Sequence, residues 1–326
     1  MAGLVEYKAG YSGLPLAVTI SKLSMRLIEN GIHIWMLGSL KTYFCSFSID
    51  MDLFSSLEQF EFCAFASGSS GNCYYIGHPE GALLIDMGLS ARKIQRNLKR
   101  IGKNLSDIHA VLVTHDHIDH IRAAESITKD HRIPVYATKG TQKGMLSNRF
   151  TAQSDTSCFY DLTPDKSLFL AGFRILPFSI SHDAEESVGF FIQNSHKRFC
   201  LATDLGFINE TAAFYLKSAN IIVLESNYDE QMLANGPYPL YLQQRIKSER
   251  GHLSNVQAAQ FLSEHWHDAI SHVFLAHLSK QNNTSETALK TLFDQLKTKG
   301  ITLNSTIHIS ALERTIPSPF FRLDGN

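Results

Sequence analysis

From about residue 62 onward, short apolar runs alternate with longer polar stretches along the chain. The apolar runs are rich in β-branched and aromatic residues and end at Gly, Ser or Asp, which is typical of strands. The polar stretches carry apolar residues at helical spacing over roughly 10 to 15 residues. This alternation predicts an α/β (α+β) fold, and the 44% hydrophobic content of the 326 residues allows a sizeable core.

The predicted elements form two groups of strands, with helices between and after them. We expect strands at 62–66, 72–76, 82–86, 110–114, 134–137, 174–178, 188–193, 198–202, 221–224, 273–276 and 306–309. We expect helices at 90–101, in the segment that ends near 129, and at 209–217, 238–247, 254–265 and 285–297, with a less regular region up to about 165. This order predicts two mixed β-sheets packed face to face with helices outside, a four-layer αββα sandwich. Periodicity alone equally fits a doubly wound sheet.

The densest polar cluster is Thr114-His115-Asp116-His117-Ile118-Asp119-His120, directly after a continuous apolar strand. Positions 115 and 117 can point the same way from an extended segment, while 119 and 120 lie where the chain enters the next helix. One loop can therefore reach two adjacent ions. Imidazole and carboxylate without thiolate suit Zn²⁺ or Mn²⁺ in an open catalytic site. The alternative is a polar loop whose histidines only form hydrogen bonds, but such crowding of titratable groups is costly without a cation.

Charge and cysteine usage narrow the setting in which the protein works. Lys plus Arg (30) and Asp plus Glu (31) nearly cancel, so the net charge neither supports nor excludes a polyanionic substrate. The five cysteines are scattered and contain no Cys-x-x-Cys pair, which argues against a disulfide framework and a thiolate zinc site. A reducing, cytoplasmic setting fits best. No run approaches the roughly 20 apolar residues that cross a bilayer, and no signal-peptide pattern is present, so we expect no membrane association.

The His-x-His-x-Asp-His pattern resembles the signature of the metallo-β-lactamase superfamily. Within this superfamily, the chain resembles the YycJ/WalJ group of metallo-β-lactamase-fold hydrolases, which is related to tRNase Z. The resemblance runs from about 62 to 309, and it is carried by the segments 66–72, 114–120, 224–229, 251–255 and 277–283. It implies a hydrolase domain over 58–326. Residues 1–57 lie outside it; they could be poorly ordered, and Met51 could be the true start.

The resemblance also implies which residues bind metal. Two divalent ions are expected, Zn²⁺ first and Mn²⁺ as the alternative. In the family, a third histidine, a bridging aspartate and a final histidine complete the centre that the first cluster begins. Matched onto this chain, the first ion is held by His115, His117 and His182, the second by Asp119, His120 and His277, and Asp204 bridges the two.

Further roles follow from the same resemblance. Asp86 closes an early strand, where it is expected to hold the histidine loop in its metal-binding shape. In related phosphodiesterases a carboxylate and a histidine act together as a proton relay, and here these are Glu225 and His252. The turn 67–72 is either a tight hairpin or a phosphate cradle close to the metals. Its candidate substrate contacts are Ser67, Ser69, Ser70 and Asn72.

The function expected from these residues is that of a metal-dependent phosphodiesterase or nuclease that acts on DNA, with exonuclease-like action. A hydroxide between the ions is the expected nucleophile, with Asp119 among the catalytic residues and His252 as the proton donor. One alternative is a small-molecule hydrolase of a thioester, lactone or cyclic phosphodiester. A β-lactam or thioester hydrolase has no reason to need the couple of Glu225 and His252. Another is a non-catalytic regulatory metal protein.

Overall fold

The computed structural model describes residues 23–28, 31–36 and 59–323. The chain divides into two units, Met1–Phe54 and Ser55–Asn326. In the first unit, β1 (Leu23–Ile28) and β2 (Gly31–Met36) pair as an antiparallel hairpin. Most of the 1–57 segment, including Met51, lies outside the described residues, so the expectations about its order and its start stay predictions.

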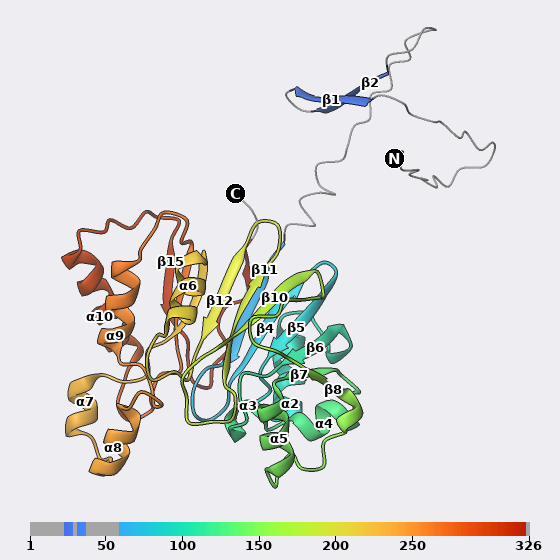
Figure 1. The fold of residues 1–326 in the computed structure, drawn as a ribbon. Coiled ribbons are helices and arrows are strands. Elements are labelled where there is room, and N and C mark those ends of the chain that lie inside the picture. The colour runs from blue at the N-terminus through green and yellow to red at the C-terminus, as the bar shows by residue number, and fades with distance from the viewer. Residues whose placement is uncertain (1–22, 29–30, 37–58, 324–326) are drawn as a thin grey trace. The chain divides into compact units, whose positions relative to one another are not determined.

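The second unit contains two mixed seven-stranded sheets (Figure 1). The first sheet has the order β16-β3-β4-β5-β6-β7-β8, antiparallel up to β5 and parallel beyond it. Its strands are β3 (Glu61–Ala66), β4 (Cys73–His78), β5 (Gly81–Ile85), β6 (Ile108–Leu112), β7 (Val135–Ala137), β8 (Phe159–Asp161) and β16 (Phe321–Arg322).

The second sheet has the order β15-β14-β13-β12-β11-β10-β9. Its strands are β9 (Leu168–Leu170), β10 (Phe173–Ser179), β11 (Val188–Gln193), β12 (Arg198–Ala202), β13 (Ile221–Glu225), β14 (His272–Ala276) and β15 (His308–Ala311). Strands β9 to β12 are antiparallel, and β12 to β15 are parallel. Each sheet thus repeats the same plan, an antiparallel half joined to a parallel half.

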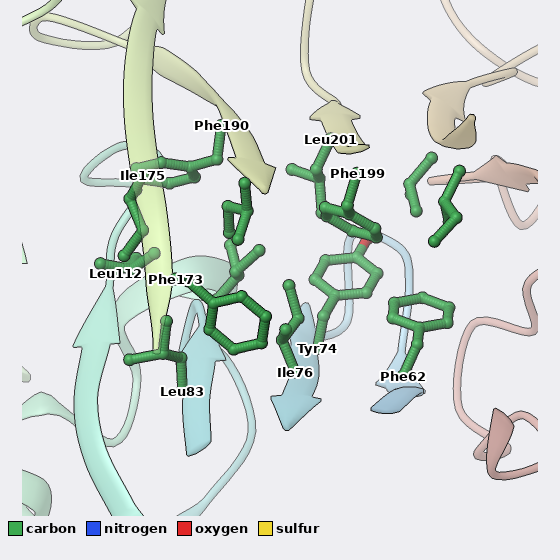
Figure 2. Close-up of a cluster of buried hydrophobic side chains, with 14 of the residues drawn as sticks. Phe62, Tyr74, Ile76, Leu83, Leu112, Phe173, Ile175, Phe190, Phe199 and Leu201 are labelled. Atoms are coloured by element: carbon green, nitrogen blue, oxygen red, sulfur yellow. The ribbon is translucent and has the colours of Figure 1, made fainter. Parts of the chain in front are cut away.

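Strand periodicity places the main core between the two sheets. In β4, Tyr74 and Ile76 face this core, whereas Tyr75 faces the outer side of the sheet. In β12, Phe199 and Leu201 face it from the opposite sheet. Figure 2 shows these side chains meeting in one apolar layer. Because successive side chains of a strand point to opposite faces, each sheet must also be covered on its outer face.

Helices provide that cover. The outer face of the first sheet packs against α2 (Ala91–Arg100), α4 (Ala124–Lys129) and α5 (Lys139–Ser147). The outer face of the second packs against α6 (Glu210–Ser218), α9 (Asn255–Glu264) and α10 (Ser285–Thr298). Of the short helices, α3 (Ile118–Ile121) follows β6, α7 (Glu230–Asn235) follows β13, and α8 (Leu240–Ile246) follows α7. The predicted αββα sandwich is therefore confirmed, and the doubly wound alternative is wrong.

The parallel halves of the sheets determine where polar residues gather. Strands β5 and β6 run parallel in one sheet, and β12, β13 and β14 run parallel in the other. Residues that follow these strands therefore emerge together at one edge of each sheet, where α/β proteins place their chemistry. Within the described residues, no helix combines the length and apolar character that a membrane span requires.

Candidate metal centre

Three histidines from two loops form the first half of the site. His115 and His117 follow β6, and His182 follows β10. The ring centroid of His115 lies 4.7 Å from that of His117 and 4.9 Å from that of His182. Potential ligand atoms of the three side chains all lie within 4.8 Å of one another. This spacing allows the three imidazoles to share one ion.

A carboxylate-rich group forms the second half. Asp119 and His120 lie in α3, and His277 follows β14; their potential ligand atoms also lie within 4.8 Å of one another. Asp204 lies between the halves, since its Oδ2 is 3.4 Å from His120 Nε2 and its Oδ1 is 4.0 Å from His182 Nε2. The structure therefore brings together all seven residues that the sequence suggested as ligands.

Four buried atoms within this group have no hydrogen-bond partner among the described residues: Nε2 of His115, His182 and His277, and Oδ2 of Asp204. Buried polar atoms are nearly always paired, because removing them from water without a partner is unfavourable. Divalent cations take imidazole nitrogens and carboxylate oxygens of this kind as ligands. The residues present therefore fit divalent metal ions.

The two halves differ in their electrostatics. Burial lowers the pKa of His115 well below its ordinary value, and the neighbouring histidines lower it further. Burial acts in the same direction on His120, but the nearby carboxylates, Asp86 first, outweigh it and raise the pKa of His120 well above its ordinary value. The same competition raises the pKa of His277 to about 9. A neutral His115 could therefore bind a cation directly, whereas His120 and His277 would have to release a proton to do so.

Backbone hydrogen bonds lock the loops that carry these residues. Asn72 N donates to Asp119 O at 2.7 Å, Met87 N donates to His120 O at 2.8 Å, and Gly88 N donates to Asn72 O at 2.8 Å. A Cβ atom at residue 88 would lie only 1.6 Å from the Asp119 carbonyl oxygen. Glycine is therefore required at 88 for the loop after β5 to approach α3 this closely.

The side chain of Asp86 supports the loop that carries the clustered histidines. Its Oδ2 lies 2.7 Å from His120 Nδ1, and its Oδ1 accepts a 2.8 Å hydrogen bond from Thr114 N. Both Asp86 and His120 are completely buried. A carboxylate on Nδ1 fixes the ring of His120 and leaves Nε2 as its ligand atom.

Three of the site residues have left-handed backbones. The φ angles are 59° at Asp86, 60° at Asp204 and 55° at His277, and each residue follows closely on a strand of a parallel half. This conformation is unfavourable for residues other than glycine, and it persists only where the surrounding packing enforces it. Each left-handed residue turns the chain sharply where a strand ends. The turn fixes the side chain of that residue at the edge of the sheet.

Glu225 and His252 lie beside the second half of the site. Glu225 is fully buried at the end of β13, and its Oε1 lies 2.8 Å from His252 Nδ1. Its Oε2 accepts hydrogen bonds from Leu205 N and Leu253 N. Burial alone would raise the pKa of Glu225, but His252 and His277 outweigh it and lower the pKa well below its ordinary value. The carboxylate is therefore ionised, and it holds His252 at the cleft, which this histidine lines.

The candidate substrate contacts of the 67–72 turn separate into two pairs. Ser67 and Asn72 are completely buried: Ser67 Oγ accepts from His277 N at 2.9 Å, and Asn72 Nδ2 contacts His120 Nε2 at 2.9 Å. Both therefore support predicted ligands instead of facing a substrate, which corrects the expectation for these two residues. Ser69 and Ser70 are exposed, and Ser69 lines the cleft.

Sequence reasoning missed three residues of this region. Asn227 Nδ2 donates to the His277 carbonyl oxygen at 2.8 Å. Asp183 follows His182 directly, and its carboxylate pairs with Arg245 of α8. The position of Asp183 beside a predicted ligand was a usable signal. Nothing in the sequence linked Arg245, 62 residues away, to the site.

Comparison with known proteins identifies the family. Residues 82–277 match the Beta-lactamase superfamily domain. The chain belongs to this superfamily. Within it, Exodeoxyribonuclease YycJ of Bacillus anthracis is 32% identical to the chain over 257 residues, which make up 79% of the chain and 97% of that relative. Exodeoxyribonuclease WalJ of Streptococcus pneumoniae serotype 2 is 33% identical over 237 residues, 73% of the chain and 88% of that relative.

A solved structure of the same superfamily confirms the fold. The metallo-beta-lactamase fold protein YhfI from Bacillus subtilis is similar with a TM-score of 0.58 and 14% sequence identity, covering 80% of this chain and 99% of that one. The predicted metallo-β-lactamase fold and the resemblance to the YycJ/WalJ group are therefore both confirmed. The chain is a metallo-β-lactamase-fold hydrolase, a fold that implies divalent metal binding, and the clustered His and Asp side chains are in place for it.

Proposed function

We propose that this hydrolase is a metal-dependent phosphodiesterase that degrades DNA, with exonuclease-like action. The observation that carries the proposal is the contact of His252 Nδ1 with the buried Glu225 carboxylate, next to the seven clustered His and Asp residues. A thioester can release its thiolate without a proton donor, whereas a phosphodiester requires a proton on its leaving oxygen. The curated relatives named exodeoxyribonucleases support DNA as the substrate.

In this proposal the ligands divide as the sequence suggested. His115, His117 and His182 would hold one ion, with Zn²⁺ favoured over Mn²⁺, and Asp119, His120 and His277 would hold the other, with Asp204 shared. When bound, such ions lower the pKa of water and stabilise negative charge on phosphoryl oxygens. Asp119 is both a ligand and a part of the cleft wall, so we count it among the catalytic residues.

The proton for the leaving oxygen comes from His252. Its Nδ1 is engaged by Glu225, which leaves Nε2 as the ring atom available to the cleft. The side chain of His252 is 22% exposed, whereas Glu225 is completely buried. The contact with the carboxylate holds the imidazole in place and fixes the direction of its second nitrogen. Glu225 is thus a positioning residue, and His252 is the general acid.

The same proposal places the reaction in the cytoplasm. The four cysteines in the described residues are free and buried, which fits the reducing conditions of the cytoplasm.

The test uses the purified protein with Zn²⁺ or Mn²⁺. End-labelled single- and double-stranded DNA, RNA and bis-p-nitrophenyl phosphate are offered in parallel. We expect loss of DNA that disappears in the Asp119→Ala and His252→Ala variants. Metal-dependent turnover of a thioester or lactone with intact DNA would instead favour a small-molecule hydrolase. No turnover by a fully metallated protein would favour a regulatory metal protein.

A further inference from the structure

Helix α8, which lies outside the motif segments that carry the family resemblance, forms one wall of the cleft. The cavity over the candidate metal centre, about 220 Å³ in volume, is lined on one side by predicted ligands and by His252. The facing wall is made of residues in or next to α8, namely Tyr238, Leu242, Arg245 and Ile246. Arg245 is the only cation of this lining outside the histidines.

Arg245 is held by a carboxylate along one edge of its guanidinium group. Its Nε donates to Asp183 Oδ2 at 2.7 Å, and its Nη2 pairs with the same oxygen. A guanidinium group has five N–H donors, so three of them remain after these two contacts. Those three have no partner among the described residues, and the side chain is 61% exposed at the cleft. The free edge therefore faces solvent with its direction already set.

Asp183 connects this guanidinium to the histidine half of the site. Its Oδ1 lies 3.5 Å from His182 Nε2 and 3.7 Å from His117 Nε2, and it is buried without a hydrogen-bond partner among the described residues. The Asp183 carboxylate therefore lies between Arg245 and two of the histidines that would hold the first ion. The ions themselves would bind a phosphate that lies at the metal centre. The guanidinium group is therefore positioned for a group that lies farther from the ions.

We infer that Arg245 binds the phosphate next to the scissile one, and that Asp183 is the positioning residue that aims it. This inference rests on the proposed function. Arginine matches phosphate oxygens with paired N–H donors, and it keeps its charge at any working pH. The substrate class is consequently a nucleic-acid strand with at least two successive phosphates. A diester with a single phosphate makes no use of Arg245.

A purely structural role explains the ion pair poorly. Ion pairs in which the cation is this exposed stabilise a fold little, because water screens them and the long side chain loses conformational freedom. Asp183 lies in the loop after β10, whereas Arg245 lies in α8, 62 positions farther along the chain. An ion pair of this kind orders the wall of the cleft, and we expect it to contribute to the binding of substrate.

The experiment compares two substrates, a single-stranded oligodeoxynucleotide and bis-p-nitrophenyl phosphate, on proteins with matched metal content. In Arg245→Ala we expect KM for the oligonucleotide to rise at least about tenfold, the usual loss for a charged hydrogen bond, with kcat nearly unchanged. Kinetics on bis-p-nitrophenyl phosphate should not change. Arg245→Lys should recover part of the KM effect, and Asp183→Asn should shift KM in the same direction by less. Arg198→Ala removes an exposed arginine at the start of β12 and serves as the matched control.

Salt provides an independent readout. For the single-stranded oligonucleotide, log(kcat/KM) should fall linearly as the logarithm of the salt concentration rises. In Arg245→Ala the slope of this line should be shallower by about 0.7, because one phosphate contact is lost. Equal losses on both substrates, or no loss on either, would overturn the inference while leaving the proposed function in place. If the unaltered protein hydrolyses bis-p-nitrophenyl phosphate but no oligonucleotide, the proposed function itself fails, and the inference fails with it.

Discussion

Glu225 Oε1 lies 2.9 Å from His277 Nδ1. The same oxygen contacts His252 Nδ1, so a single carboxylate oxygen serves both a predicted metal ligand and the proposed general acid. In the proposed mechanism, metal binding and proton donation are therefore coupled through one buried residue, and variants of Glu225 and His252 should separate the two roles.

His252→Gln should keep its metal and lose activity. The side chain is not among the seven predicted ligands, and general acid catalysis typically contributes about 10²–10⁴-fold. Glu225→Gln should lose activity and metal together, because His277 then lacks its ionised partner. Metal analysis and DNA turnover on the same preparations check both statements. Retention of full metal content by Glu225→Gln would show that its contact with His277 is unimportant.

Asp86→Asn should weaken metal binding. The amide keeps the shape of the side chain but removes the charge beside His120 Nδ1, and carboxylate partners of ligating histidines typically contribute about 10–100-fold in affinity. Competitive titration with a chromogenic chelator measures this change. Asp268→Asn, at an exposed position, is the control. An affinity equal to that of the unaltered protein would contradict the role given to Asp86.

Gly88→Ala should destabilise the protein. The new methyl group would overlap the Asp119 carbonyl oxygen, so the loop after β5 or α3 must move. Overpacking of this kind typically lowers the free energy of unfolding by about 1–3 kcal/mol. Gly102→Ala is a control for backbone strain alone, because its φ is 75° but no atom lies within 4 Å of the added Cβ. Urea unfolding compares the two, and equal losses would exclude the steric explanation.

Much of the fold could be predicted because its signals are local. The apolar runs of β11 and β12 were placed at their observed bounds, and Ser90 caps α2 as expected, accepting a hydrogen bond from Lys93 N. Strands that are buried on both faces produce continuous apolar runs, which are easily recognised. The His-x-His-x-Asp-His loop was equally visible, because its ligands are neighbours in the sequence.

The missed elements lack such signals. Helix α5 contains Gly140 and Gly144, which disfavour helix formation, yet any side chain at 144 would overlap Asp116. Strand β16 has two residues, and it is ordered by pairing with β3, more than 250 positions earlier. The remaining omissions among the described helices and strands are β1, β2, α7, β8 and β9, the last two being strands of three residues.

The site was only partly predictable for a similar reason. Its ligands follow strand ends and could be matched to a family pattern. The left-handed conformations of Asp86, Asp204 and His277 and the contact between Asp183 and Arg245 depend on tertiary packing. Packing of this kind leaves no local trace in the sequence.

The stability of the protein should fall in mild acid partly because of His272. Burial first, and then His308 and Lys197, lower the pKa of His272 to about 4. The unfolded chain, with an ordinary histidine pKa near 6.5, therefore binds a proton more readily than the folded protein. Stability is complete above about pH 6.5 and declines as the pH falls towards 4. In His272→Phe this contribution is absent, so denaturant midpoints measured from pH 7 to 4.5 should fall less steeply than in the unaltered protein. Parallel curves would contradict the assignment.

In the proposed centre, four residues of one loop and three residues from distant parts of the chain bind a pair of divalent ions. Inductively coupled plasma mass spectrometry on protein loaded with Zn²⁺ or Mn²⁺ and freed of excess metal tests it most directly. We predict two ions per chain, about one in His182→Ala, and a loss from both halves in Asp204→Ala. A loaded protein that retains less than one ion per chain, or an Asp204→Ala variant that retains two, would contradict the account.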